Sequence, residues 1–254
     1  GDNGELVTSD TAWFETAKLD EPFTAQRISP CLAPDTAPYM RRAFEITGEV
    51  LSARAYFTGL GIYELYLNGE KANDEYLVPG CTAYDSWIQY QTYDVTALLK
   101  EGENRLEVQL ADGWYRGSCG AWGLLNQYGT QTKLLAQLEY ADESGNIHTI
   151  CSDDSWAWSN DGPIRFADNK DGEVVDGRML PSYSGKVRET SCPVVPSASN
   201  NVPVTEHERF RPQVIHTPGG KTVLDFGQNI AGYVEFSLKA KAGQRVKLQF
   251  GEML

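Results

Sequence analysis

The chain has 254 residues, which is enough to bury one large hydrophobic core or two smaller ones. Its formal net charge of −13 argues against nucleic acids and anionic membrane surfaces as partners, because both are negatively charged. No apolar run approaches the length of a membrane-spanning helix, and the 24 glycines and 12 prolines are spread along the chain, as suits an all-β protein with many turns.

The cysteines and the first residues bear on the cellular compartment. The five cysteines are scattered, odd in number and without a CxxC pair, which favours free thiols in a reducing compartment over a zinc site. The opening residues, GDNGELVTSD, lack the basic and apolar regions of a signal peptide. A cytoplasmic location is therefore favoured over secretion, although the compartment stays open because a signal peptide is removed from a mature chain.

The first part of the chain predicts a lead-in followed by strands. Residues 1–38 carry several prolines after an aromatic segment at 13–16, so they cannot form a helix and are predicted to be extended and packed on the next domain. Residues 39–58 predict two strands joined near Gly48.

The sharpest local signal is the Asn68-Gly69 pair that ends the alternating run 62–67. Both central residues of a type I′ turn need positive φ, which Asn and Gly tolerate, so a β-hairpin is predicted here. Period-2 alternation predicts further strands at 89–95 and 105–110.

Shorter signals fill the gaps between these strands. Residues 94–99 predict a short helical turn with Asp94 or Thr96 as its N-cap. Residues 133–140 and 147–151 predict two hairpin strands joined by a tight turn.

Three loops have unusual compositions. Residues 112–117, DGWYRG, predict an aromatic plug over the end of a β-sandwich; the alternative is a sugar platform, in which aromatic faces stack on C–H groups and the arginine bonds hydroxyls. The next loop, 118–132, is long enough to be functional. Residues 167–178 form an acidic, glycine-interrupted loop that is either structural or a cation or sugar site.

The last part of the chain predicts a linker and a second β unit. Residues 191–212 are rich in serine, proline and asparagine, as is typical of linkers. Strands are predicted at 221–226, 232–238 and 246–250. Two or three strands do not make an independent domain, so residues 213–254 are expected to be a truncated start of a second β-sandwich.

Familiar catalytic motifs are absent from the sequence. It contains no GxSxG elbow, phosphate-binding loop, dinucleotide fingerprint or HExxH motif. Its three histidines, His148, His207 and His216, are isolated. Glycoside hydrolysis needs two carboxylates, but the Asp153-Asp154 pair is interpreted as part of a solvated turn. No catalytic residue is predicted in this chain.

Several motifs together carry a resemblance to a known family. In chain order they are WFET at 13–16, YLNG at 66–69, PG at 79–80, YQTYDVT at 90–96, GEN at 102–104, DGWYRG at 112–117, NQYG at 126–129, LLAQL at 134–138, DGE at 171–173 and LDFGQN at 224–229. This set resembles the N-terminal part of bacterial α-L-rhamnosidases of glycoside hydrolase family 78, and it covers nearly the whole chain.

The resemblance implies a fold and a role. It implies a galactose-binding-like β-jelly-roll sandwich over residues 39–190, followed by the first strands of a second β-sandwich. It also implies that the acid and base that hydrolyse terminal α-L-rhamnosides, with inversion, lie on a large (α/α)₆ barrel beyond Leu254. The chain is then a non-catalytic fragment that supports the barrel and binds rhamnose-type sugars; the alternative is a purely structural or interaction domain.

Candidate site residues and partners follow from this reading. The candidate sugar-binding residues are Trp114, Tyr115, Arg116, Trp122 and Asn126. Some members of the family bind rhamnose on this jelly roll through calcium, which makes the candidate metal ligands Asp85, Asn126, Asp168, Asn169 and Glu173. No cofactor is required, and calcium is the candidate ion. The expected partners are rhamnose-containing glycosides, the rest of the parent enzyme with its barrel, and a second copy in a homodimer.

Overall fold

A computed structural model of the chain describes residues 8–12, 14–30 and 37–252. The described elements in chain order are β1 Ile28–Pro30, β2 Tyr39–Ile46, β3 Val50–Leu60, β4 Ile62–Leu67, β5 Glu70–Lys71, β6 Gln89–Asp94, η1 Thr96–Leu98, β7 Gly102–Ala111, α1 Gly113–Arg116, β8 Lys133–Asp142, β9 Ile147–Cys151, β10 Ala157–Ser159, β11 Ile164–Asp168, β12 Gly172–Val175, β13 Gly185–Glu189, β14 Ser197–Ala198, β15 Gln213–His216 and β16 Thr222–Asp225. The all-β prediction is confirmed, and no described helix is long and apolar enough to cross a membrane. The chain divides into two compact units, Gly1–Thr205 and Glu206–Leu254.

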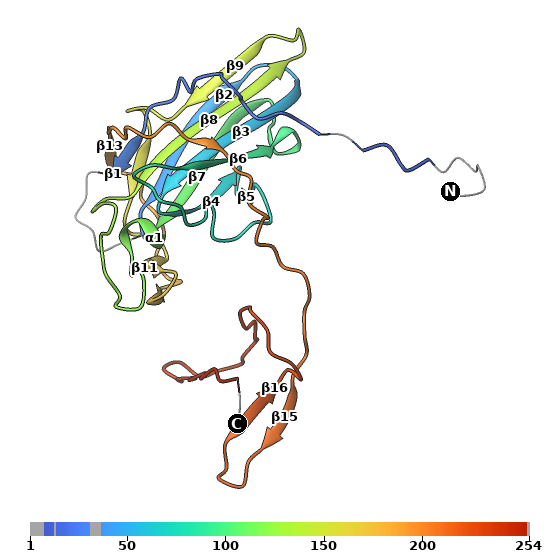
Figure 1. Cartoon of the computed structure of the whole chain (residues 1–254), viewed down its shortest axis with the longest axis vertical. Helices are drawn as coiled ribbons and strands as arrows, with labels where there is room; N and C mark the ends of the chain where they lie inside the picture. Colours follow the sequence, from blue (N-terminus) through green and yellow to red (C-terminus); the bar gives the residue numbers. More distant parts are fainter. Residues whose placement is uncertain (1–7, 13, 31–36, 253–254) are drawn as a thin grey trace. The chain divides into compact units, whose positions relative to one another are not determined.

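The first unit is a β-sandwich made from one continuous series of hydrogen-bonded strands (Figure 1). One layer has the order β6-β3-β8-β1, and the other has the order β10-β2-β7-β4-β5. Strand β13 joins the two layers by pairing with both β1 and β10. Strand β9 extends β8 as a hairpin, and β14 lies parallel to the outer edge of β6.

Consecutive strands change layers near the start of the sandwich. The prediction of two strands over 39–58 is confirmed: they are β2 and β3, and Gly48 between them has φ +83°. Strand β2 pairs with β7, whereas β3 pairs with β6 and β8 in the other layer. Such crossings between two antiparallel sheets are what a jelly roll requires.

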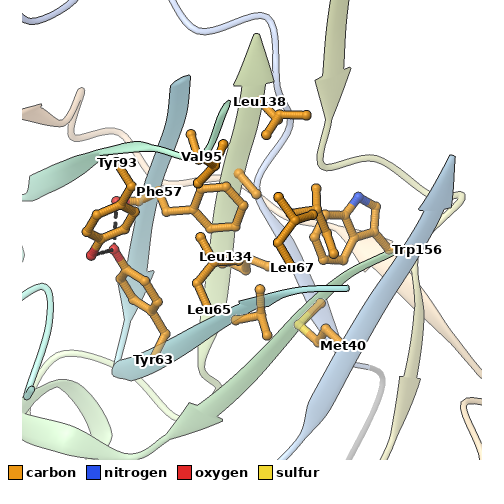
Figure 2. Packing of buried hydrophobic residues seen from close by; sticks show 14 of the residues in the cluster. Met40, Phe57, Tyr63, Leu65, Leu67, Tyr93, Val95, Leu134, Leu138 and Trp156 are labelled. Carbon is orange, nitrogen blue, oxygen red and sulfur yellow. Dashed lines mark hydrogen bonds between the residues drawn. The ribbon is translucent and has the colours of Figure 1, made fainter. Parts of the chain in front are cut away.

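The hydrophobic core lies between the two layers (Figure 2). On β4, burial alternates strictly, so that Tyr63, Leu65 and Leu67 face inward. From the opposite layer, Leu134 and Leu138 of β8 belong to the same cluster. The period-2 pattern of β4 therefore corresponds to one buried face, as it does in β7.

Two tyrosine hydroxyls meet inside this core, as Figure 2 shows. The hydroxyl oxygens of Tyr63 and Tyr93 are 3.0 Å apart, and the Tyr63 hydroxyl donates to the Gln91 side chain at 3.0 Å. Burial raises the pKa of both phenols. The pair keeps polar groups satisfied where water does not reach them.

The described part of the lead-in packs on the first unit around a buried lysine. The Lys18 ammonium lies 2.7 Å from a Glu139 carboxylate oxygen and 4.6 Å from the ring centroid of Tyr56. Of the aromatic segment at 13–16, Trp13 lies outside the described residues, and the prediction of packing is wrong for Phe14, which is exposed.

The hairpin predicted at Asn68-Gly69 is confirmed. Strands β4 and β5 pair around this turn, and φ is +56° at Asn68 and +87° at Gly69. The strands predicted at 89–95, 105–110 and 133–140 are also present, as β6, β7 and β8.

The predicted N-cap at residues 94–99 is wrong in position. The turn is a 3₁₀ helix whose N-cap is Val95, a residue without a capping side chain. Asp94 still contributes, because its Oδ1 accepts hydrogen bonds from the Thr96 backbone at 3.0 Å and the Thr96 hydroxyl at 2.6 Å.

The acidic stretch 167–178 is not a continuous loop. Strands β11 and β12 form an antiparallel hairpin, and only residues 169–171 lie between them. Carboxylates and glycines dominate the composition and hide the β-branched pair Val174 and Val175, which lies in β12.

The predicted linker 191–212 is attached to the first unit as far as Val204. Strand β14 pairs with β6, and the Gln89 side chain forms hydrogen bonds of 2.7 Å with those of Asn200 and Asn201. The boundary between the two units, after Thr205, falls inside this segment.

The second unit contains one described hairpin, β15–β16, with four paired positions. Strand β16 matches the prediction at 221–226. The predictions at 232–238 and 246–250 are wrong for the described residues, which form no strand there. A strand needs a partner for its backbone groups, and most large apolar residues of these two stretches, Phe236 and Phe250 among them, are exposed.

Candidate functional site

The candidate site lies at one end of the sandwich, where β7 runs into α1. Helix α1 is a single turn, and Gly113 at its start has φ +53°. A Cβ at Gly113 would come within 2.7 Å of Ile62, so the close approach and the backbone conformation both require glycine. The Asp112 N–H donates to Ala167 O at 3.1 Å, which links α1 to β11 at the same end in Figure 1.

Helix α1 closes this end through aromatic packing. Tyr115 is only 6% exposed and belongs to a second apolar cluster with Leu60, Tyr84 and Ile88. Trp114 is partly buried and packs against the same cluster. This packing fits the aromatic plug that the composition predicts.

Arg116 is engaged inside the protein. Its guanidinium is buried and lies 3.3 Å from the Asp112 carboxylate, one helical turn earlier. Its carbonyl accepts the Asn126 N–H at 2.8 Å. Arg116 therefore fixes the start and the return of the following loop, rather than presenting donors to solvent.

Loop 118–132 carries the two accessible candidates. The Trp122 side chain is 87% exposed, and Asn126 is exposed with φ +58°. Cys119 and Leu124 exchange two backbone hydrogen bonds of 3.0 Å, which close the tip of the loop around Trp122. Of the five sugar candidates, the structure presents Trp122 and Asn126 to solvent and packs Trp114, Tyr115 and Arg116 into the sandwich end.

Tyr84 is a residue that the motif search did not single out. Its ring contacts those of Tyr115 and Tyr128, with centroids 5.4 Å and 5.2 Å away, and its hydroxyl donates to Gly80 O at 2.8 Å. Loop 81–87 is thereby held against loop 118–132. The available signal was one tyrosine in each of two loops, which gives no partner without the fold.

Asp168 has a structural role. It is 7% exposed, its Oδ2 accepts the Ser118 N–H at 2.8 Å, and its Oδ1 accepts the N–H groups of Lys170 and Asp171 at 2.7 and 2.8 Å. A Cβ at Gly117 would overlap this carboxylate. Asp168 thus joins the end of α1 to the turn of the β11–β12 hairpin.

The other candidate metal ligands are exposed and lie on three separate segments. Asp85 lies in loop 81–87, Asn126 in loop 118–132, and Asn169 and Glu173 in the β11–β12 hairpin. Within the described ranges, no group of three or more His, Cys, Asp or Glu side chains could hold a metal ion. The Asp168 oxygens accept backbone N–H groups, so Asp168 has a structural role, and calcium binding stays a prediction.

The Asp153-Asp154 pair also belongs to a turn. Asp153 Oδ1 accepts the Ser155 N–H at 2.9 Å, and its carboxylate lies 3.8 Å from the Arg42 guanidinium. Asp154 is exposed. The interpretation of this pair as a solvated turn fits these contacts.

The chain is similar to known proteins over nearly its whole length. A family model described as the α-L-rhamnosidase N-terminal domain matches residues 48–213. The chain belongs to this family. A second model, described as the bacterial α-L-rhamnosidase concanavalin-like domain, matches residues 215–254. The resemblance seen in the sequence motifs is therefore confirmed, and both loops of the candidate site lie inside the first match.

Individual α-L-rhamnosidases support the assignment. The enzyme of Alteromonas sp. (strain LOR) is 34% identical over 247 residues, which cover 91% of this chain and 27% of the relative. The crystal structure of the native Aspergillus terreus enzyme is 34% identical, has a TM-score of 0.75, and is matched over 82% of this chain and 26% of that chain. The Streptomyces avermitilis enzyme, crystallised with L-rhamnose, is 36% identical and has a TM-score of 0.71. The match covers 78% of this chain and 20% of that chain.

The chain spans about a quarter of the length of the curated α-L-rhamnosidases that it matches. The matched structures bear out the jelly-roll sandwich as the fold of the first unit.

Proposed function

We propose that this chain is the non-catalytic N-terminal part of an α-L-rhamnosidase whose longer form hydrolyses terminal α-L-rhamnosides. The observation that carries the proposal is one of coverage. Curated α-L-rhamnosidases match 85–95% of this chain at 31–35% identity, yet the chain spans only 23–27% of their length. The role of this chain is to support the catalytic barrel.

The local chemistry agrees with a supporting role. Asp153 and Asp168 each lie in one of the two carboxylate clusters, and both accept hydrogen bonds from the backbone of their own turns. Glycoside hydrolysis instead needs an acid and a base that face each other across the substrate.

Assays of the chain and of the longer enzyme with an aryl α-L-rhamnoside test this proposal. We expect no turnover by this chain alone and turnover by the longer protein that contains it. If the intact longer protein left the aryl α-L-rhamnoside untouched while it cleaved another glycoside, the assignment would be wrong.

A second function, rhamnose-type sugar binding by the loop face, is favoured by the exposure of Trp122. An indole held at the tip of a loop, with the Asn126 amide and the Tyr128 ring on the same loop, offers a stacking face and hydrogen-bonding groups. The alternative is a structural role without sugar binding.

Titration calorimetry with L-rhamnose, with and without calcium, separates the two roles. For sugar binding, we expect heat that Trp122→Ala abolishes and that Asn126→Ala reduces. Trp122 lies outside the core, so its loss leaves folding intact. No heat at millimolar sugar would leave the structural role alone, and heat that requires calcium would support the calcium prediction.

A further inference from the structure

The Asn68-Gly69 turn between β4 and β5 has a sequence and an exposure that favour a spontaneous chemical change. Glycine follows asparagine, so no side chain hinders the approach of the Gly69 backbone nitrogen to the Asn68 side chain. Gly69 is exposed, and no described atom beyond its chain neighbours lies within 4 Å of the place that a Cβ would take there. The tip of the turn is therefore open to water and has room for a ring to form.

The Asn68 side chain, by contrast, is held by three hydrogen bonds. Its amide nitrogen donates to Leu98 O and to Asn104 Oδ1, both at 2.8 Å, and its Oδ1 accepts the Arg105 N–H at 2.9 Å. Asn104 is itself 0% exposed and donates to two backbone carbonyls of its own turn. These contacts hold the Asn68 amide against the segment between η1 and β7 and use both of its N–H groups.

We propose that Asn68 is a deamidation site that these three hydrogen bonds keep closed in the folded chain. In the reaction, the Gly69 backbone nitrogen attacks Cγ of Asn68, and the bond from Cγ to Nδ2 breaks. The proton of the Gly69 N–H leaves with Nδ2 as ammonia, which produces a cyclic imide. Water then adds to either carbonyl of this imide and opens it to aspartate or isoaspartate, so water is the one co-reactant.

The hydrogen bonds slow this reaction because they must break before it begins. The side chain has to turn away from its three partners for Cγ to meet the Gly69 nitrogen, and all three bonds belong to one planar amide, so they are lost together. The folded chain is therefore expected to react at least about tenfold more slowly than the unfolded chain. Deamidation at Asn68 then proceeds through opening of the turn.

The product no longer fits the contacts that the amide makes. A carboxylate at this position has no N–H to donate to Leu98 O, and it places a negative charge beside two acceptor oxygens. Isoaspartate also adds a methylene to the backbone of a two-residue turn in which φ is +56° at Asn68 and +87° at Gly69. The modified chain is therefore less stable than the unmodified chain, and the change is permanent.

Peptide mapping of the aged full chain tests the proposal. The chain is incubated in mildly alkaline buffer with and without a denaturing concentration of urea, and aspartate and isoaspartate at position 68 are followed by mass spectrometry and by isoaspartate methyltransferase labelling. The other Asn-Gly pair, Asn3-Gly4, lies outside the described residues and is measured on a separate peptide.

The rate at Asn68 should follow unfolding. We expect it to be at least about tenfold lower without urea than in the denaturing concentration, and to rise across intermediate concentrations with the unfolded fraction measured by circular dichroism. Equal rates in the folded and the unfolded chain would overturn the proposal.

Three variants separate the amide contacts from the sequence of the turn. Asn104→Ala removes one acceptor of the Asn68 amide, so the folded variant should deamidate severalfold faster than the unmutated chain. Asn73→Ala is the matched control, because Asn73 Oδ1 accepts the Glu75 N–H at 2.8 Å in its own turn, and it should leave the rate unchanged. Gly69→Asn keeps a residue that tolerates positive φ but places a side chain beside the attacking nitrogen, so it should slow the reaction in urea.

Circular dichroism shows whether Asn104→Ala is folded under the conditions of the incubation. A folded Asn104→Ala chain that deamidates at Asn68 no faster than Asn73→Ala does would overturn the proposal. If Asn104→Ala does not fold, the urea dependence of the unmutated chain decides.

Discussion

Single buried side chains hold the sandwich together through packing and one or two directed hydrogen bonds. Trp156 is 1% exposed in the main core, and its indole N–H donates to Cys151 O at 3.0 Å. Trp122, by contrast, is almost fully exposed. Substituting each of the two tryptophans therefore separates the contribution of the core to the free energy of unfolding from that of the loop face.

We expect Trp156→Ala to lower the free energy of unfolding by about 3–5 kcal/mol, because it removes a large buried ring and leaves a cavity. Urea denaturation followed by circular dichroism measures this change. Trp122→Ala is the matched control and should stay within about 0.5 kcal/mol of the unmutated chain. Equal losses for the two variants would contradict this assignment of core and surface.

The carboxyl group of Asp142 makes the stability of the β8–β9 hairpin depend on pH. Hydrogen bonds from His148, Asn146 and Ser144 hold the pKa of its carboxyl well below the usual range. The His148 ring nitrogen lies 2.9 Å from Oδ2, and the N–H groups of Asn146 and Ser144 donate to Oδ1, each at 2.9 Å. A lowered folded-state pKa stabilises the protein above the unfolded pKa and loses that stabilisation as the pH falls.

Asp142→Asn should therefore lower the urea midpoint at neutral pH. The difference from the unmutated chain should shrink as the pH falls below about 4, the usual Asp pKa, because the carboxylate then protonates in the unfolded state. Midpoints measured at several pH values, down to the lowest at which both proteins stay folded, check this. The exposed Asp154→Asn is the control, and a gap that stays constant with pH would refute the role of charge.

At the scale of elements, the Asn68-Gly69 turn does more than reverse the chain. The Asn68 amide nitrogen donates to Leu98 O and to Asn104 Oδ1, both at 2.8 Å, and Asn68 Oδ1 accepts the Arg105 N–H at 2.9 Å. Asn104 is fully buried and donates to Lys100 O at 2.7 Å. The two asparagines join the β4–β5 turn to the segment between η1 and β7.

Asn68→Gly keeps the positive φ but removes these amide bonds, and leaves the buried Asn104 without one partner. We expect a loss of about 1–3 kcal/mol in the free energy of unfolding. Asn126→Gly is the matched control, since Asn126 also has positive φ but is exposed, and it should be nearly neutral. Thermal and urea unfolding of both variants test this prediction. An unchanged free energy of unfolding for Asn68→Gly would show that Asn68 contributes only its backbone conformation and not its amide hydrogen bonds.

The elements that sequence could predict are those whose signal is local. Alternation over six or more residues predicts β6 and β7, and Asn68-Gly69 predicts a turn with positive φ at both central residues. The same alternation at 232–238 misleads, because a pattern shows which face is apolar but not whether a partner strand exists. The β11–β12 hairpin was missed because its turn chemistry, rich in Asp and Gly, extends into the strands.

The candidate site was only partly predictable for a related reason. The unusual composition of the motif at 112–117 marks it as a candidate site. Its sequence does not show that the Tyr115 ring packs against Tyr84, which is distant in sequence, or that Arg116 pairs with Asp112. Likewise, Asp168 looks like a metal ligand by composition. Its hydrogen bonds to the backbone of Ser118 and of its own turn make it a structural anchor.

On the scale of the whole molecule, the main question is where the first unit ends. The predicted linker, 191–212, contains β14, and Ser197 accepts a hydrogen bond of 3.0 Å from the Trp87 indole. Residue Val204 then forms an isolated bridge with Tyr76. The sandwich therefore uses residues up to about the boundary after Thr205, rather than ending at residue 190.

Two truncations test this boundary. A chain that stops at Thr205 keeps the core, β14 and the Gln89–Asn200–Asn201 amide contacts, and should melt close to the first unit of the full chain. A chain that stops at residue 190 loses β14 and leaves the buried Gln89 side chain unpaired. That loss is roughly 1–3 kcal/mol, which lowers Tm by several degrees for a unit of this size. Calorimetry of both chains measures it, and identical melting of the two would show that the segment is a linker after all.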